Sequence, residues 1–543
     1  MLAQSLNTSL AQFYFSLKAL DVKSLAIGIL VLWISWRMWA FTVIPKLRPH
    51  NPLVLPYALP VIGHTLSWLW NRVQLLEDGN KYFPGHFPFA LLISGKKVIV
   101  IRSPNDIKTI WNDPKSFTFD EYMIGIVKGL GISPSHYSLA FEENPAKLWK
   151  GSDSDAPHFV KENPAKRRLV SLQENWMKEA LQPGPKMEAA SELFRENIKG
   201  LVPIFLAHPR VAATGSKNLG ELISLFKRGR YVLAGAGTKA FLGPKIFDID
   251  PDFVQHYLDW EDLSWKIPYG HPKILSKDML EAEEVLVQVL MKYFAFDPIH
   301  RPNLNWLFDT MQSNQRKIGL TAHDAGAAAI VMLWGIHLNP PRLLFWALAH
   351  ILCSPVLTQK IREETNLAFD PTTKSFSISH LMNNCPALTA TWHEALRLYT
   401  SSSVVRTCES PAVIGDKTIN IGDRLIGPFS FVHLSPLIWG DDAQDFDEQR
   451  WLKEGFKTPK GFYPFGGGHM HCPGRFIAKQ VVVLFIATVL RDYSIEPVSE
   501  KFESGSEAEM RWKVPEEPKE HAGAAGISNP NDDFLVRVTR RYT

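Results

Sequence analysis

The sequence predicts a mainly helical protein with a small β region, preceded by an N-terminal transmembrane helix. Residues 25–44 form a 20-residue stretch that is apolar except at three positions, which is long enough to cross a bilayer. Most of the later segments with a readable pattern favour helices, the longest being 322–353, whereas 87–101 has the alternation and central turn of a β-hairpin. With 543 residues, of which 45% are hydrophobic, the chain can bury one large core or two.

The N-terminal apolar stretch is predicted to anchor the chain in a membrane as a single pass. Arg37 lies toward one end of the stretch and can extend its charge to the interface. Lys46 and Arg48 follow the span, so residues 1–24 are expected in the lumen and the rest in the cytosol, at the endoplasmic reticulum. A cleaved signal peptide is the alternative, but the span starts late and no small-residue cleavage site follows it.

The segments behind the anchor can be assigned in order. Five prolines between residues 45 and 64 predict a stiff hinge with neither helix nor strand. The predicted helices include 105–111, 189–200, 280–294 and 386–399, and the predicted strands include 403–407 and 534–538.

The most informative stretch runs from Phe465 to Arg475, where a glycine-rich turn leads through Cys472 into an apolar helix. Its glycines let the backbone adopt positive φ and pass close to a flat ring system. The turn and the start of the helix can aim N–H groups at the sulfur, which favours a thiolate. A thiolate is one of the few side-chain groups that hold a haem iron, so the pattern indicates haem ligation by Cys472. The alternative is a buried free cysteine in a turn.

This stretch resembles the signature Phe-Gly-x-Gly-x-Arg-x-Cys-x-Gly of the cytochrome P450 family. The matching positions are Phe465, Gly466, Gly468, Cys472 and Gly474. The resemblance implies that Cys472 is the axial ligand of the haem iron, that Phe465 contacts the haem, and that residues 65–543 form one catalytic domain, mainly α with a small β region. Met470 stands at the arginine position of the signature, so the haem propionate that this arginine usually neutralises must be paired elsewhere.

Two further landmarks have the order and spacing of that family. Glu394 and Arg397 lie at i and i+3 on the predicted helix 386–399, so they can pair. The resemblance adds Arg450 as a third member of a buried set that holds the cysteine loop in place. Arg406 projects from the strand that follows, and similar proteins use an arginine there to hold a haem propionate. Because the signature lacks its own arginine, Arg406 is predicted to bind the cofactor.

The long apolar segment 322–353 resembles the helix that crosses the distal face of the haem in this family. Two prolines near its midpoint should kink it, and with their neighbours they make a second membrane span unexpected. Where most members carry an acid and a threonine that deliver protons, this chain has Leu338 and Asn339. Asn339 is therefore predicted to be the distal catalytic polar group, and Gly335 the small residue that leaves room for oxygen.

The reaction is predicted from the same departure. An asparagine followed by proline and then by Phe345-Trp346 is similar to the branch that contains sterol 7α-hydroxylases and prostacyclin synthase. This implies a monooxygenase that oxidises a lipophilic substrate such as a sterol, a terpenoid or another secondary metabolite. One alternative is an isomerase of a hydroperoxide or endoperoxide, which needs no reductase; another is a haem-binding membrane protein without turnover.

Composition limits the partners. A net charge of +4 without a basic stripe gives no support for nucleic-acid binding. The four cysteines lack the spacing of disulfides or zinc sites, which fits a domain facing the reducing cytosol. Neither a dinucleotide-binding nor a flavin motif is visible, so the expected electron donor is a membrane-bound NADPH–cytochrome P450 reductase that docks near the Cys472 face.

Overall fold

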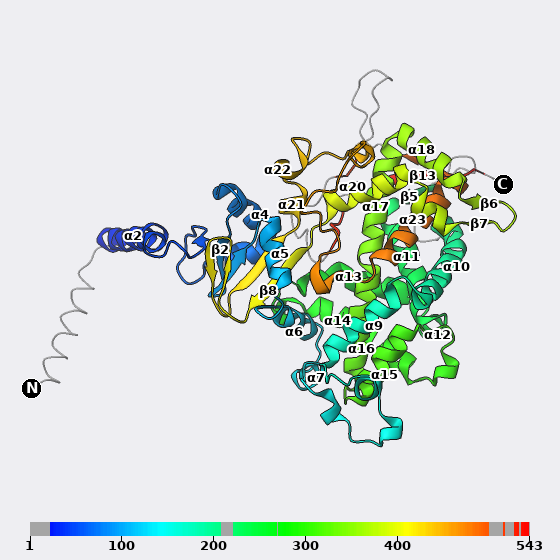
Figure 1. The fold of residues 1–543 in the computed structure, drawn as a ribbon, viewed down its shortest axis with the longest axis horizontal. Helices are drawn as coiled ribbons and strands as arrows, with labels where there is room; N and C mark the ends of the chain where they lie inside the picture. The colour runs from blue at the N-terminus through cyan, green and yellow to red at the C-terminus, as the bar shows by residue number, and fades with distance from the viewer. Residues whose placement is uncertain are drawn as a thin grey trace, which may run out of the picture.

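The computed structural model describes residues 22–207, 221–268, 270–498, 514–515, 526–531 and 534–541. Most of these residues are helical, and small sheets lie beside the helices, so the predicted fold class is confirmed. Figure 1 shows the anchor helix projecting from one end of the molecule, a β-rich part next to it, and the larger helical part beyond.

The α-helices have the bounds α2 Val22–Met38, α3 Ile44–Leu47, α4 Thr65–Tyr82, α5 Pro104–Asn112, α6 Asp120–Gly129, α7 Pro134–Ala140, α8 His158–Lys161, α9 Leu169–Leu181, α10 Pro185–Ala207, α11 Leu225–Leu242, α12 Lys245–Ile249, α13 Phe253–Leu263, α14 Lys277–Ala295, α15 Trp306–Lys317, α16 Ala322–His337, α17 Asn339–Cys353, α18 Pro355–Asn366, α19 Ile378–Asn383, α20 Pro386–Tyr399, α21 Ser430–His433, α22 Pro436–Trp439 and α23 Arg475–Asp492. The strands are β1 Leu53–Val54, β2 Phe89–Ile93, β3 Lys96–Val100, β4 Phe117–Thr118, β5 Glu221–Ser224, β6 Phe369–Asp370, β7 Ser375–Phe376, β8 Ser403–Cys408, β9 Ala412–Ile414, β10 Lys417–Ile419, β11 Arg424–Pro428, β12 Tyr493–Pro497 and β13 Leu535–Arg540.

The anchor is a longer helix than the sequence predicts. Val22–Leu47 forms 26 continuous helical residues that are apolar enough to span a membrane, and none of its most apolar stretch is buried inside the protein. Exposed apolar side chains on an isolated helix need a lipid environment, which is what the prediction for 25–44 requires. Gly468–Asp492 is a second helix of sufficient length and hydropathy, but 61% of its apolar window is buried inside the protein. Residues 1–21, which include most of the predicted lumenal end, lie outside the described part.

The prediction of a hinge without secondary structure over 45–64 is wrong in two places. Ile44–Leu47 continues the anchor as helix α3, and Pro45 lies just after the π-helical turn Trp39–Val43, where the Ile44 N–H donates to the Trp39 carbonyl. Leu53–Val54 forms strand β1, which pairs in parallel with Phe89–Ala90. The segment between this strand and α4 folds back onto the anchor, since the Trp33 indole N–H donates to the Ala58 carbonyl at 2.7 Å.

The larger sheet has six strands in the order β1-β2-β3-β11-β8-β4. The predicted hairpin over 87–101 forms β2 and β3, and Ser94 and Gly95 between them both have positive φ, as a tight hairpin turn requires. The predicted strand 403–407 is part of β8, which pairs antiparallel with β11. The predicted strand 534–538 contributes to β13, which lies between β12 and β5 in the second sheet.

The core lies among the long helices, and α14, α16, α17, α20 and α23 each contribute buried apolar side chains to it. The segment 322–353 forms α16 and α17, which are separated only at Leu338. Pro340 and Pro341 cannot donate to the preceding turn, so the hydrogen-bond ladder is broken there while Leu338 keeps helical φ and ψ. The helix α17 packs against α20 and α23, which brings the distal segment close to the helix that follows Cys472.

Candidate active site

The loop that carries Cys472 is shaped by glycines. Gly466 and Gly468 have φ values of 70° and 65°, where other residues are strained, and the Cys472 N–H donates to the Phe465 carbonyl at 3.0 Å. A Cβ on Gly467 would lie 2.5 Å from the ring of Trp111 on α5, so only glycine lets α5 close on the loop. The predicted turn-and-helix pattern is therefore present, with α23 starting three residues after Cys472.

The environment of Cys472 suits a sulfur ligand. Burial raises the pKa of the Cys472 thiol, while the backbone N–H groups of Gly474 and Arg475 and the charge of Arg475 act in the opposite direction. The Cys472 residue is partly buried and keeps some accessible surface. The other three cysteines lie outside this loop, and burial raises their pKa values as well.

Phe465 lies at the start of the loop, half-buried. Its ring stacks on Trp392 of α20 with the centroids 6.4 Å apart, so the loop is held against that helix by aromatic contact. The predicted contact of Phe465 with the haem stays a prediction.

A buried ion cluster joins α20 to the segment that precedes the loop. The Arg397 guanidinium donates twice to Glu394, at 2.7 and 2.9 Å, and the Arg450 Nε lies 3.5 Å from the same carboxylate. The Trp451 indole N–H also donates to Glu394, at 2.8 Å. Glu394 and Arg397 are both fully buried, so the pair predicted from i, i+3 spacing is a core element and not a surface pair.

Arg406 is a buried cation without an acidic partner. Among the described residues its side chain has no carboxylate within ion-pair distance, and its guanidinium donates to the backbone carbonyl of Val405 at 2.7 Å. It also lies 5.2 Å from the ring centroid of Phe119. Burial lowers the pKa of Arg406 and the charge of Glu174 raises it, but Glu174 is not close enough to form an ion pair.

Two further basic residues, His469 and Lys178, lie near this position, and the sequence analysis did not select them. Burial lowers the pKa of His469 in the cysteine loop, and the positive charges of Arg406 and Lys178 lower it further. Lys178, on α9, is therefore close enough for its charge to affect His469 of the cysteine loop. The sequence did offer one signal for Lys178, because Glu174 and Lys178 lie at i, i+4 on one helix face. The Trp-x-x-x-Arg pattern by which related proteins bind a propionate at this helix is missing.

The segment 322–353 has one accessible strip of surface, which includes Gly335 and Asn339 and is called the open stripe. Gly335 is exposed and a Cβ there would meet nothing within 4 Å, whereas its neighbours Trp334 and His337 are buried. Asn339, one turn on, is half-buried on the same stripe, while Leu338 is buried in the core. The Asn339 Oδ1 accepts the backbone N–H of Ile527 at 2.9 Å, a contact that the sequence does not predict.

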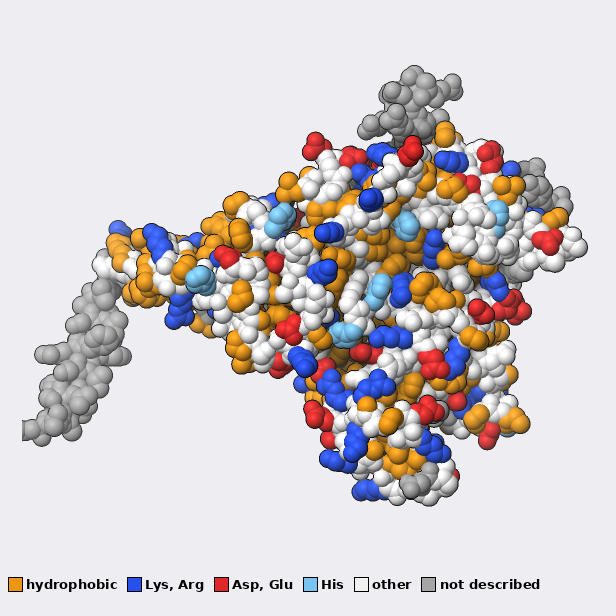
Figure 2. Space-filling view, in the orientation of Figure 1, with side chains coloured by type: hydrophobic (Ala, Val, Ile, Leu, Met, Phe, Trp, Pro, Cys, Tyr) orange, Lys and Arg blue, Asp and Glu red, His pale blue; other side chains and the backbone are white. Residues whose placement is uncertain are grey.

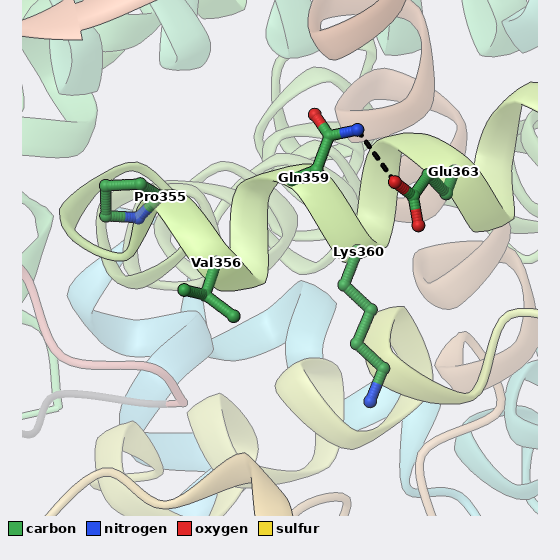
Figure 3. Close-up of a pocket in the computed structure, with 5 residues that line it drawn as sticks. All are labelled: Pro355, Val356, Gln359, Lys360 and Glu363. Atoms are coloured by element: carbon green, nitrogen blue, oxygen red, sulfur yellow. Dashed lines mark hydrogen bonds between the residues drawn. The ribbon is translucent and has the colours of Figure 1, made fainter.

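The surface of the molecule has two hollows of different kinds. Figure 2 shows a hollow in the middle of one face, with hydrophobic side chains deep inside it and basic side chains and histidines around it. A different hollow lies on the outer face of α18. Figure 3 shows that its five residues come from this one helix, with Gln359 donating to Glu363 at 2.8 Å. It is a surface groove that includes none of the predicted site residues.

The residues present fit a haem. A sulfur held by a glycine loop, a buried arginine with no acidic partner among the described residues and an open glycine on α16 could supply an axial ligand, a propionate partner and clearance over a flat ring. The arrangement of Cys472, Arg406 and Gly335 is the combination that such a cofactor requires.

Comparison with known proteins points the same way. The Cytochrome P450 family model matches residues 258–520. Cytochrome P450 monooxygenase nodJ of Hypoxylon pulicicidum is 22% identical over 550 residues, which covers 95% of this chain and 94% of that protein. Cytochrome P450 monooxygenase calL of Penicillium decumbens is 24% identical over 57% of this chain, a match that covers 62% of that relative's length. Cholesterol 7-alpha-monooxygenase of Cricetulus griseus is 29% identical over 39% of this chain and 44% of that protein.

Proposed function

Because the chain belongs to the cytochrome P450 family, whose members bind haem through a cysteine thiolate, we propose that it is a membrane-anchored monooxygenase of a lipophilic small molecule. The observation that carries this proposal is Cys472, presented by a glycine loop at the start of α23 with backbone N–H groups directed at its sulfur. The nodJ relative over nearly the whole chain is named a monooxygenase, which supports the same reaction class.

The residues of the chain divide the work around the cofactor. When bound, the haem supplies the activation of molecular oxygen, and a thiolate ligand favours O–O cleavage. Cys472 would hold the iron, while Arg406 and Lys178 would place positive charge near the propionates in place of the missing signature arginine, and the neutral His469 could add a hydrogen bond there. Gly335 keeps the distal helix clear of the reacting atoms, and Asn339 supplies a polar group there for orienting water.

Membrane attachment supports the substrate class. Beside the anchor, α4 and the turn before it expose large apolar side chains, with Val61 85% and Trp70 80% exposed. Together with Val22–Leu47 this apolar surface suits contact with a bilayer, from which a sterol, terpenoid or similar molecule would enter. We place the enzyme in the endoplasmic reticulum membrane, with its domain in the cytosol and an NADPH–cytochrome P450 reductase as electron donor. A bifunctional cytochrome P450/NADPH–P450 reductase of Gibberella moniliformis, 25% identical over 45% of this chain, supports this kind of donor.

An isomerase of a hydroperoxide or endoperoxide is the second candidate. It is favoured by one observation: Leu338 is a buried apolar residue where an acid usually lies, so the acid–threonine relay is missing. Such an isomerase needs no reductase and no proton delivery to oxygen. A haem-binding protein without turnover is less well supported, because Gly335 leaves open space on the distal helix.

One experiment separates these functions. The purified full-length protein should show the thiolate-type absorption band of the reduced CO complex, and Cys472→Ser should abolish it, whereas the control Cys353→Ser should retain it. Lipophilic candidate substrates are then supplied with NADPH, reductase and isotopically labelled O₂. Label in the product supports the monooxygenase. Rearrangement of a peroxide substrate without NADPH and without label would replace it with the isomerase.

A further inference from the structure

The three consecutive glycines before Cys472 are required for different reasons. Gly466 and Gly468 have φ values of 70° and 65°, in the left-handed region that favours glycine. Gly467, between them, has φ and ψ of −174°, which is extended backbone that any residue adopts. The backbone conformation therefore explains two of the glycines and leaves the third to be explained by its surroundings.

The space beside Gly467 is filled by Trp111, the last residue but one of α5. A Cβ on Gly467 would lie 2.5 Å from the Cζ3 atom of the Trp111 ring, and a Cβ on Gly468 would lie 3.0 Å from the Trp111 Cβ. The ring thus covers one glycine and the stem of the side chain covers the next. Non-bonded carbon atoms pack at about 3.5–4.0 Å, so a methyl group at residue 467 has no room while the tryptophan is present.

Trp111 is held in place by the β-rich part of the molecule. Ile107 and Ile110 of α5 are fully buried in the apolar cluster that this helix shares with β3, β8 and β11. The Trp111 ring makes an edge-on contact with Tyr463, with the centroids 4.8 Å apart, and its centroid lies 6.1 Å from that of Phe429. Close packing on this side leaves the ring little freedom, so the helix presents a fixed aromatic surface to the cysteine loop.

Tyr463 connects the same contact to the start of the loop. Its carbonyl accepts the Gly466 N–H at 3.0 Å, and its own N–H donates to the His433 Nε2 at 2.8 Å. Burial lowers the pKa of His433 to about 3, so its ring is neutral and can accept this hydrogen bond. Trp111 therefore touches the loop at two places, at Tyr463 where the loop begins and at the glycines of the turn.

We propose that Trp111 is a positioning residue for the axial ligand, which holds the glycine turn so that the Cys472 sulfur keeps a fixed orientation toward the backbone N–H groups that follow it. Those groups belong to Gly474 and Arg475 and favour the thiolate. Hydrogen bonds to a ligating sulfur tune the metal that it binds, so a turn released from Trp111 would change the electron donation by the sulfur as well as the stability of the loop. The inference rests on the proposed function for the identity of the group that Cys472 binds.

The role of Trp111 is tested on the full-length haem-loaded protein. Trp111→Ala should lose the thiolate-type band of the reduced CO complex about fivefold faster than wild type, because the loop loses an aromatic contact. It should also lower the reduction potential of the protein that keeps the band, because fewer N–H groups then face the sulfur. Trp111→Phe keeps a ring against the turn and should return both values toward wild type. Faster loss of the band with an unchanged potential would make Trp111 a stabilising residue only and overturn the proposal.

Trp149 provides a matched control. It is also half-buried, and its ring also fills the space beside a glycine, Gly151, in the segment between α7 and α8. That segment contains none of the site residues, so Trp149→Ala should leave both the CO band and the reduction potential as in wild type. A lower potential in Trp149→Ala, equal to that in Trp111→Ala, would contradict a specific role for Trp111.

The contact itself is tested by combining two variants and measuring denaturant unfolding from the protein signal. Gly467→Ala should lower the folded-to-unfolded ratio at a fixed denaturant concentration about tenfold in wild type, because its methyl group meets the ring, and less than about twofold in Trp111→Ala. Equal effects in both backgrounds would refute the contact.

This unfolding measurement uses neither turnover nor the haem spectrum, so it separates the two proposals. A wild-type protein without the thiolate-type CO band would refute the proposed function even where the two substitutions are non-additive. A wild-type protein with the band, but with additive substitutions and an unchanged potential in Trp111→Ala, would refute the positioning role alone.

Discussion

Replacing Glu394 with glutamine should lower the stability of the fold around α20 without changing Cys472 itself. The Glu394 Oε1 accepts hydrogen bonds from Arg397 and from the Asp447 N–H, and the Oε2 accepts from Arg397 and Trp451. Glutamine has the same shape but turns one oxygen into an amide donor. In either orientation that donor faces two N–H groups, and the buried Arg397 loses its counter-charge.

The magnitude follows from burial. Glu394 and Arg397 have no exposed surface, and Arg450 is also buried, so water cannot replace the lost charge. Removing one partner of such a pair costs about 3–5 kcal/mol, which is a large share of the roughly 5–15 kcal/mol that stabilises a folded protein. We expect Glu394→Gln to lower the free energy of unfolding by that amount.

The assay is denaturant unfolding of the full-length protein, followed by the reduced CO band as a measure of the intact haem site. Glu363→Gln on the exposed face of α18 is the matched control and should change stability by less than about 0.5 kcal/mol. If Glu394→Gln lowers the free energy of unfolding by less than about 1 kcal/mol and leaves the CO band unchanged, the cluster does not stabilise the fold as argued from its burial.

Three other outcomes are expected. Deleting residues 1–47 should release the protein from carbonate-washed membranes or leave weak peripheral binding, whereas integral behaviour would require a second span. Arg406→Leu should weaken haem retention in a competition with apomyoglobin, since a buried cation near the propionates is lost; unchanged retention would remove Arg406 from the site. Burial lowers the pKa values of His337, His350 and His433 to about 3, from 6.5. The unfolded chain therefore takes up protons first, so stability should fall as the pH drops below 6.5, by up to about 1.4 kcal/mol per histidine and pH unit; a flat profile between pH 6.5 and 4.5 in denaturant titrations contradicts this.

Local sequence signals were sufficient to predict the elements whose shape depends on only a few neighbouring residues. The helix predicted over 386–399 has the bounds of α20, because Pro386 supplies an N-terminal residue suited to the first turn and the chain after Tyr399 reads as a strand. The hairpin at Ser94-Gly95 and the glycine turn before Cys472 are equally local. Strand β1 was missed because two residues paired in parallel with a distant strand leave no periodic pattern.

The candidate site was predictable to the extent that a motif carries its own geometry. Cys472 and Glu394 belong to short patterns with a fixed local shape, whereas Lys178 and His469 become neighbours of Arg406 only when α9, the cysteine loop and β8 are packed together. Long-range electrostatics of this kind has no counterpart in spacing along the chain.

The two departures from the family pattern have different consequences in space. Met470 removes one positive charge from the cysteine loop, whereas Arg406 and Lys178 both act on His469 of that loop, which supports our proposal that they take over the role of the missing arginine. At the distal helix, by contrast, Leu338 turns into the core and Asn339 engages a backbone N–H of a distant segment. A residue that would be expected to act on oxygen thus also holds a distant backbone segment. A loss of activity in Asn339→Ala should therefore be interpreted together with the hydrogen-exchange rate at Ile527, because displacement of that segment and loss of a water-orienting amide could both reduce turnover.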